Sequence, residues 1–188
     1  MHVEVFFDYL CPWSHLSQAR VEGLIERHDI RVTWTPFELH PEIPPGGTDR
    51  RWGKTGTGSM LRPLAEAAGL PLERRSNIVN TRRALGLSAW AMDQPAWPVL
   101  HRNLFAAYWG ADADLDDPLV LADLADRADI EGAPGAIAEG AGLPAVVAAK
   151  ERALDLGVGG TPGWVFDGGQ AFTGLHDDAV LDRIIERA

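Results

Sequence analysis

Cysteine is almost absent from this sequence of 188 residues, which contains only Cys11. A single thiol excludes a disulfide within the chain, a zinc site built on cysteines and an iron–sulfur cluster. Any sulfur chemistry must therefore join Cys11 to a thiol or disulfide from another molecule. Cys11 itself is open to two interpretations, a buried apolar side chain or a nucleophile.

Positive charge is also scarce, since 17 lysines and arginines face 27 acidic residues and leave a net charge of −10. This balance argues against binding to nucleic acid or to an anionic membrane, because both need a positive surface. The basic residues concentrate in residues 48–83, whereas residues 111–139 are strongly acidic. Two interpretations remain open: solvated faces of opposite sign, or a basic segment that attracts an anionic substrate or thiol.

Long apolar runs are missing, and no stretch approaches the roughly 20 apolar residues that cross a bilayer. The first eight residues lack the basic start, apolar run and cleavage site of a signal peptide. We therefore expect a soluble protein of the cytoplasm, a compartment that keeps thiols reduced.

Motifs for bound metals and nucleotides are missing as well. No two of the six histidines have the helical spacing of metal ligands, so we expect no metal site. Gly53-Lys54-Thr55 lacks the glycine that a phosphate-binding loop places five positions earlier, so we expect no bound nucleotide.

The first forty residues predict a strand, a helix and a second strand. Residues 3–7 form a short apolar run, and Pro12 stands where a helix can begin. Residues 30–35 then alternate apolar and polar side chains until Pro36. The spacing is typical of a parallel pair of strands joined by a helical crossover.

The middle of the chain predicts helices only. A loop rich in proline and glycine follows residue 41, and helical patterns cover residues 60–69, 72–92, 96–109, 117–128 and 144–156. We therefore predict that residues 41–156 form a helical insertion domain.

Strand patterns return after residue 157. Residues 164–166 and 170–172 flank Asp167-Gly168-Gly169, which predicts a hairpin, and Asp177 and Asp178 open a final helix. Residues 1–40 and 157–188 together predict one discontinuous α/β domain.

Cys11 lies directly after the first predicted strand, at the start of the predicted helix. Free N–H groups and the helix dipole favour a thiolate there, so this position predicts a lowered pKa and a reactive thiol. Pro12 pre-shapes the first turn, and we expect Trp13 to form an apolar wall beside the sulfur. His15 is either a positive group that tunes Cys11 or a surface histidine.

A second motif, Thr161-Pro162, lies in a glycine-rich segment before the returning strand. It is either a flexible loop or a turn with a cis Thr–Pro bond. Such a turn would leave the backbone of Thr161 free to hydrogen-bond an extended peptide.

Together these features resemble the DsbA-like branch of the thioredoxin superfamily: Cys-Pro-Trp-Ser after a first strand, Thr-Pro before a hairpin, and helices between. Residues 36–41, 80–84 and 153–158 sharpen the resemblance toward its polyketide-associated, FrnE-like subfamily. The resemblance implies an α/β thioredoxin-like fold with a large all-helical insertion.

The resemblance also implies roles for individual residues. Cys11 takes the place of the attacking thiol of a C-x-x-C motif, and Pro162 that of the cis-proline facing it. Ser14 replaces the resolving cysteine, so the site is C-x-x-S and cannot store a disulfide. This favours thiol exchange, isomerase or thiol-conjugating chemistry over net oxidation, with Ser14 donating a hydrogen bond to the thiolate.

The implied substrate is a thiol or disulfide, either a protein or a small molecule. A small thiol such as glutathione would be a co-substrate, with no cofactor bound. The substrate-binding residues expected from the motifs are Pro12, Trp13, His40, Thr161 and Pro162.

Two alternatives stay open. Kappa-class glutathione transferases and 2-hydroxychromene-2-carboxylate isomerases of the same superfamily have serine where this chain has Cys11, and act through bound glutathione. Ser14 and the basic segment favour such an enzyme for aromatic small molecules, whereas Cys11 and residues 36–41 argue against it. The other alternative is a non-catalytic binding scaffold with a buried, unreactive Cys11.

Overall fold

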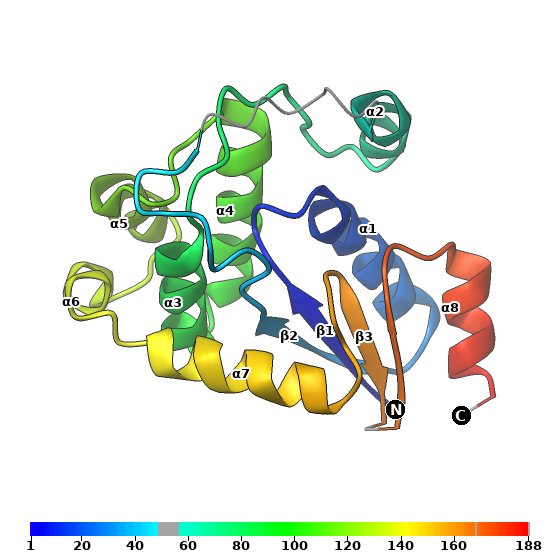
Figure 1. Ribbon diagram of the computed structural model, residues 1–188. Coiled ribbons are helices and arrows are strands. Elements are labelled where there is room, and N and C mark those ends of the chain that lie inside the picture. Colours follow the sequence, from blue (N-terminus) through cyan, green and yellow to red (C-terminus); the bar gives the residue numbers. More distant parts are fainter. Residues whose placement is uncertain (49–56, 168, 188) are drawn as a thin grey trace.

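The structure, a computed structural model, describes residues 1–48, 57–167 and 169–187. Its strands form a four-stranded sheet in the order β2-β1-β3-β4, and they all come from the two ends of the chain (Figure 1). The strands are β1 (His2–Phe7), β2 (Arg31–Pro36), β3 (Gly163–Phe166) and β4 (Gln170–Thr173). The fold is therefore a mixed α/β fold, as predicted.

Strand β1 is central and pairs in parallel with β2 and antiparallel with β3. Its last five residues are fully or almost fully buried, which explains their nearly continuous apolar run. Strands β3 and β4 form the predicted antiparallel hairpin, where Asp167 adopts a positive φ of 41°. Gly168, in the same predicted turn, lies outside the described residues.

The helices of the described ranges are α1 (Pro12–Arg27), α2 (Thr57–Ala67), α3 (Arg82–Ala91), α4 (Trp97–Ala111), α5 (Pro118–Asp126), α6 (Ala133–Glu139), α7 (Leu143–Asp155) and α8 (Asp178–Ile185). Six of them, α2 to α7, fall within residues 41–156. The described part of this segment contributes no strand to the sheet, only one isolated bridge between Thr48 and Ile78. Its status as a separate domain stays a prediction.

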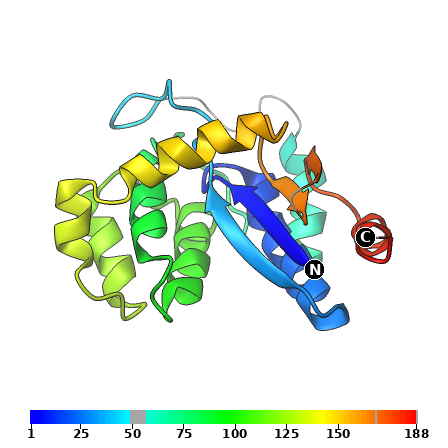
Figure 2. The ribbon, with the colours of Figure 1, turned by 90° about the horizontal axis from the view of Figure 1, so that it is seen from below.

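The sheet carries helices on both faces, because successive side chains of β1 point to opposite sides. Val3 and Val5 pack with residues of α1 and α8, including Leu24 and Leu181. Phe6 packs on the other side with Ala153 of α7 and its neighbours. Figure 2 shows α7 and α8 on opposite sides of the strands.

The largest cluster of buried side chains lies in the insertion and reaches the end of β1. Phe7 and Tyr9 belong to it together with aromatic residues of α4. The indole N–H of Trp109 donates to the carbonyl oxygen of Tyr9 at 3.0 Å. The insertion therefore packs directly against the segment that leads into Cys11.

The predicted helix over residues 72–92 is wrong in its first half, because α3 begins only at Arg82. The backbone before it bonds to other segments: Glu73 N–H donates to the carbonyl of Trp109, and Ile78 pairs with Thr48. The buried Arg75 guanidinium donates to the carbonyls of Tyr108 and Ala113. These partners, distant in sequence, hold the segment in an irregular conformation.

The sequence prediction also missed α6. Its glycines and proline are residues typical of loops. Pro134, however, stands in the first turn of the helix, where an N–H group would have no partner within the helix. Gly132 and Gly140 adopt positive φ at the two ends of this helix.

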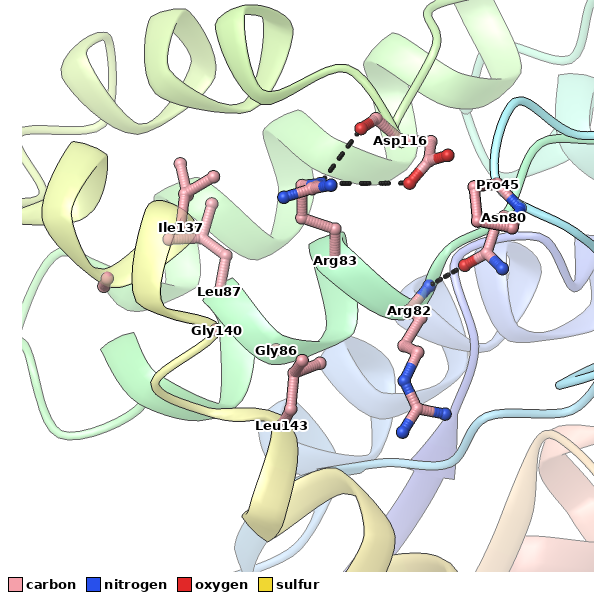
Figure 3. A pocket seen from close by; sticks show the side chains of 11 residues that line it. Pro45, Asn80, Arg82, Arg83, Gly86, Leu87, Asp116, Ile137, Gly140 and Leu143 are labelled. Atoms are coloured by element: carbon pink, nitrogen blue, oxygen red, sulfur yellow. Dashed lines mark hydrogen bonds and ion pairs between the residues drawn. The ribbon is translucent and has the colours of Figure 1, made fainter.

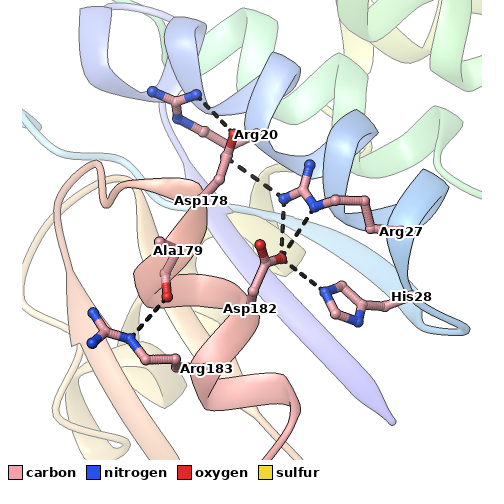
Figure 4. A network of polar contacts seen from close by, with 7 residues as sticks. All are labelled: Arg20, Arg27, His28, Asp178, Ala179, Asp182 and Arg183. Carbon is pink, nitrogen blue, oxygen red and sulfur yellow. Dashed lines mark hydrogen bonds and ion pairs between the residues drawn. The ribbon is translucent and has the colours of Figure 1, made fainter.

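The final helix begins where the two aspartates predicted it, with Asp177 as N-cap. Ion pairs attach α8 to α1 (Figure 4): Asp182 lies 3.1 Å from Arg27 and 2.8 Å from His28, and Asp178 lies 3.3 Å from Arg20. Among the described residues, no helix is both long and apolar enough to cross a bilayer.

Candidate active site

Cys11 is the N-cap residue of α1, directly after the turn that leaves β1. Its own N–H donates to the carbonyl oxygen of Asp8 at 3.0 Å, and its carbonyl accepts from the N–H of His15 at 3.1 Å. Pro12 occupies the first helical turn, as predicted. The structure thus places the thiol at the start of the helix, where the sequence predicted it.

The thiol of Cys11 meets the second predicted motif. Its S–H donates to the carbonyl oxygen of Thr161 at 3.2 Å. The Thr161–Pro162 peptide bond is cis, which confirms the predicted turn. The carbonyl of Thr161 accepts from the thiol, and a hydrogen bond from the backbone of Thr161 to an extended peptide stays a prediction.

The predicted lowering of the Cys11 pKa is wrong for this structure. Cys11 is only 3% exposed, and burial raises its pKa by disfavouring the thiolate. The contacts with Thr161 and with the backbone and hydroxyl of Ser14 act in the opposite direction, and the charge of Asp8 raises the pKa further. Desolvation outweighs the helix N-terminus here, and the thiol is protonated at neutral pH.

Ser14 and Trp13 occupy different surroundings. Ser14 is fully buried, and its hydroxyl oxygen lies 3.5 Å from the N–H of Asp8. Trp13 is half-buried and packs on a cluster formed by Leu16 of α1 with Leu61 and Ala65 of α2. Helix α2 therefore supports the side chain next to the thiol.

His15 does not match either of its interpretations, whereas the substrate contact expected of His40 stays a prediction. His15 is 1% exposed, and burial lowers its pKa to about 4, so the ring is neutral. Its Nε2 lies 2.8 Å from the carbonyl oxygen of Pro71 and its Nδ1 lies 3.1 Å from the amide of Gln18. His15 is therefore neither a positive tuning group nor a surface residue. His40 is exposed, and its Nδ1 lies 2.7 Å from Glu42.

Asp8 is a site residue that the sequence prediction missed. It is completely buried, three positions before Cys11, and burial raises its pKa to about 6. Its carboxylate accepts hydrogen bonds from Thr81, from the N–H of Leu39 and from the N–H of Leu10. The signal was present, because a carboxylate directly after a buried strand needs partners from elsewhere in the fold.

Three arginines of the basic segment have acidic partners. Arg75 lies 3.3 Å from Asp112, Arg83 lies 3.8 Å from Asp116, and Arg82 lies 2.7 Å from Glu38. Two of these partners belong to the acidic stretch, so the segments pair with each other rather than form separate faces. Arg50, Arg51 and Lys54 lie outside the described residues.

A pocket of about 170 Å³ opens beside α3, with Leu87, Ile137 and Leu143 among its apolar residues (Figure 3). Arg82 and Arg83 line it as well, but their guanidinium groups pair with Glu38 and Asp116. The pocket therefore presents two compensated charges. Nowhere in the described ranges do three histidine, cysteine or carboxylate side chains gather as a metal site requires.

Residues 2–186 match the family of DSBA-like thioredoxin domains. The chain belongs to this family. The match spans the sheet, the insertion and α8, and it includes both Cys11 and Pro162.

Several known proteins are similar to this DSBA-like chain. It is 24% identical over 139 residues to the uncharacterized protein YwbO of Bacillus subtilis (strain 168), covering 71% of this chain and 68% of YwbO. Its fold is similar to that of a protein described as a probable DsbA oxidoreductase from Streptomyces coelicolor, with a TM-score of 0.86 and 22% identity over 100% of this chain and 89% of that chain.

Two further solved structures are similar at lower identity. One is a 2-hydroxychromene-2-carboxylate isomerase, with a TM-score of 0.79 and 18% identity over 100% of this chain and 95% of that chain. The other is the cytosolic disulfide reductase DsbM from Pseudomonas aeruginosa with GSH, with a TM-score of 0.67 and 14% identity over 99% and 100%. At these identities the likeness establishes the fold alone.

Proposed function

We propose that this DSBA-like protein is a thiol–disulfide oxidoreductase or isomerase that uses Cys11 as its single nucleophile, in a C-x-x-S variant of the FrnE-like subfamily. The observation that carries the proposal is the contact between Cys11 and Thr161. It joins a thiol at a helix N-terminus to a cis Thr–Pro turn 150 residues away. Packing alone does not require these two motifs to meet at the sulfur.

The first step is attack on a disulfide. Cys11 loses its proton, and the thiolate attacks one sulfur of the substrate. The substrate S–S bond breaks, a mixed disulfide forms between Cys11 and one half of the substrate, and the other half leaves as a thiolate that takes up a proton. The hydroxyl and N–H of Ser14 stabilise the Cys11 thiolate before attack, in agreement with their effect on its pKa.

The second step needs an external thiol, because Ser14 cannot form a disulfide. An incoming thiolate attacks the substrate sulfur of the mixed disulfide and displaces the Cys11 thiolate, which regains its proton. The substrate leaves joined to the incoming thiol, and Cys11 ends in its starting oxidation state. If the incoming thiol is another cysteine of the same substrate, the net result is isomerisation.

We assign the substrate contacts to Pro12, Trp13, His40, Thr161 and Pro162. The carbonyl of Thr161 accepts the hydrogen bond of the Cys11 thiol, and Pro162 is the next residue in the chain. Pro12 follows Cys11 directly. Trp13 offers a half-buried apolar surface next to them. His40 is exposed, follows the segment that bonds to Asp8, and would contact only a substrate that extends over that loop.

The external thiol is proposed to be a small molecule of the glutathione type. The similar fold of DsbM, solved with GSH, supports this assignment. DsbM is described as cytosolic, which agrees with a cytoplasmic location, where small thiols are reduced.

The test is exchange between glutathione and a small synthetic disulfide, followed as the thiol released from the synthetic disulfide. We expect the wild type to accelerate the exchange, Cys11→Ala to abolish the acceleration, and Ser14→Ala to weaken it. If the exchange proceeds at its uncatalysed rate in the presence of correctly folded wild type, the proposal is refuted.

One observation favours a second candidate, a binding scaffold without thiol chemistry: Cys11 is almost fully buried and its pKa is raised. This candidate predicts that Cys11 resists both alkylation and mixed disulfide formation in the folded protein. A glutathione-dependent isomerase for aromatic molecules, whose fold is similar, instead predicts that Cys11→Ser retains activity. The exchange assay tests the proposed function, alkylation of Cys11 tests the scaffold, and isomerisation of an aromatic substrate by wild type and Cys11→Ser tests the third candidate.

A further inference from the structure

The carboxylate of Asp8 joins three segments that lie far apart in the sequence. Oδ1 accepts from the hydroxyl of Thr81 at 2.6 Å and from the N–H of Leu10 at 3.2 Å. Oδ2 accepts from the N–H of Leu39 at 2.8 Å. Thr81 is the N-cap of α3, Leu10 precedes Cys11, and Leu39 follows β2.

The backbone of Asp8 meets the turn of the thiol as well. Its carbonyl accepts from the N–H of Cys11 at 3.0 Å, and its N–H lies 3.5 Å from the hydroxyl oxygen of Ser14. One residue therefore holds the nucleophile's turn through its main chain and the helical insertion through its side chain.

Hydrogen bonds stabilise the charge of Asp8, because the ionisable groups that face it are acids. They are Cys11 and Tyr9 of the same turn, Glu38 of the loop after β2, and Tyr108 of α4. The nearby cation Arg82 pairs with Glu38. A buried carboxylate in these surroundings depends on its three donors to remain ionised.

We propose that Asp8 is a positioning residue through which the hydrogen bond from Thr81 links the N-terminus of α3 to the reactivity of Cys11. The ionised carboxylate opposes a second negative charge on the sulfur, so it adds to the effect of burial in disfavouring the Cys11 thiolate. Movement of α3 that removes the Thr81 hydroxyl leaves Asp8 with two donors, both main-chain N–H groups. The carboxylate then takes up a proton and the barrier to forming the thiolate falls.

This inference rests on the proposed function only in taking Cys11 as the reactive group. It adds a route by which a ligand that contacts α3 would change the thiol. The pocket beside α3 is lined by Asn80 and Arg82, the two neighbours of Thr81.

The test is the rate of Cys11 alkylation by iodoacetamide as a function of pH, in wild type and in Thr81→Val, Thr81→Ala and Thr81→Ser. Valine and alanine remove the hydroxyl, so Asp8 holds a proton more often near neutral pH and we expect Cys11 to react faster there. The rate at pH 7 should rise about threefold, the change that half a pKa unit produces. Serine keeps the donor and should match the wild type, whereas Asp8→Asn carries no charge at any pH and should lower the alkylation midpoint itself.

Carbon NMR of labelled protein measures the titration midpoint of the Asp8 carboxyl group directly. A purely structural role of Thr81 would leave this midpoint unchanged. The Asp8 midpoint should rise in Thr81→Val and remain unchanged in Thr81→Ser. The inference is wrong if folded Thr81→Val and Thr81→Ala keep the wild-type alkylation profile, or if both lower the rate. Failure of the proposed function is distinguishable, since a shifted alkylation profile without catalysed thiol exchange would refute only the enzyme.

Discussion

The sulfur of Cys11 lies 3.2 Å from the carbonyl oxygen of Thr161 and donates its proton to it. This bond connects the start of α1 with the turn before β3. Loss of the thiol proton frees that carbonyl. Activation of the nucleophile and loss of this hydrogen bond are therefore one event.

The reactivity of Cys11 should increase only at alkaline pH. Because burial raises its pKa, we expect the alkylation midpoint of the folded protein above the ordinary thiol value of ~8.5. At pH 7 the folded protein should react more slowly than the urea-unfolded chain, because burial disfavours the thiolate. The kinetics of alkylation by iodoacetamide from pH 6 to 10 give the midpoint and the rate at pH 7. A midpoint below 7 in the folded protein would contradict the burial of Cys11 in the structure.

Asp8 should make the protein less stable as the pH rises through the range 4 to 6. Its pKa is about 6 in the folded chain and about 3.9 in an unfolded one, so the folded state binds more protons in that window. The free energy of unfolding should therefore fall by about 3 kcal/mol relative to Asp8→Asn across it. Urea titrations of both proteins at pH 4, 5, 6 and 7 test this. Parallel stability curves would exclude a buried, titrating Asp8.

His101 should have the opposite effect on the acid side. Its ring packs against aromatic side chains, including those of Phe7 and Trp97, and burial lowers its pKa to about 3. Above the unfolded pKa of about 6.5, His101 is neutral in both states and its full contribution to the free energy of unfolding is present. As the pH falls below about 6.5, the unfolded chain takes up a proton that the folded chain does not, so the folded protein loses stability. The loss should reach about 3 kcal/mol at pH 4.

His101→Phe should remove this acid-dependent loss and cost little at pH 7. Within the described residues, Nε2 of His101 is buried without a hydrogen-bond partner. Nδ1 lies 3.2 Å from the Tyr9 hydroxyl, which retains Ser88 as a partner in the variant. Thermal unfolding at pH 7 and pH 4 provides the comparison. An equal acid-dependent loss in variant and wild type would assign the effect to other groups.

Arg75 should resist even a conservative replacement. Its guanidinium donates to the carbonyls of Asn77, Tyr108 and Ala113 and lies 3.6 Å over the ring of Tyr108. A single ammonium cannot reproduce this fork, so Arg75→Lys should lower the free energy of unfolding by about 2–4 kcal/mol. The exposed neighbour supplies the control, since Arg74→Lys should have almost no effect. A change below about 0.5 kcal/mol in Arg75→Lys would show that the carbonyls find other partners.

The sequence predicts the elements whose patterns are local. The apolar run of β1, the alternation of β2, the Asp-Gly signal before β4 and the paired aspartates before α8 each lie within a few residues, and the structure confirms them. Residues 72–81 behave differently because their partners are distant. The three carbonyls that Arg75 binds cannot be found from the helical spacing of its neighbours.

Features of the candidate site also differ in whether they could be predicted from the local sequence. The position of Cys11 at a helix start follows from local chemistry, whereas the residues around Pro162 left a flexible loop and a cis turn open, and the structure decides for the turn. The raised pKa of Cys11, the buried Asp8 and the neutral His15 depend on how closely the insertion covers the end of β1. Burial is a property of the assembled fold, so a motif alone predicts the group and not its charge.

The intact mass of the protein after incubation with glutathione disulfide tests the central claim most directly. Because Ser14 cannot resolve a mixed disulfide, we predict that one glutathione accumulates on the folded wild type, that Cys11→Ala carries none, and that Ser14→Cys releases it as an internal disulfide forms. Folded wild type without the adduct, at a pH where iodoacetamide alkylates Cys11, would contradict thiol exchange at this site.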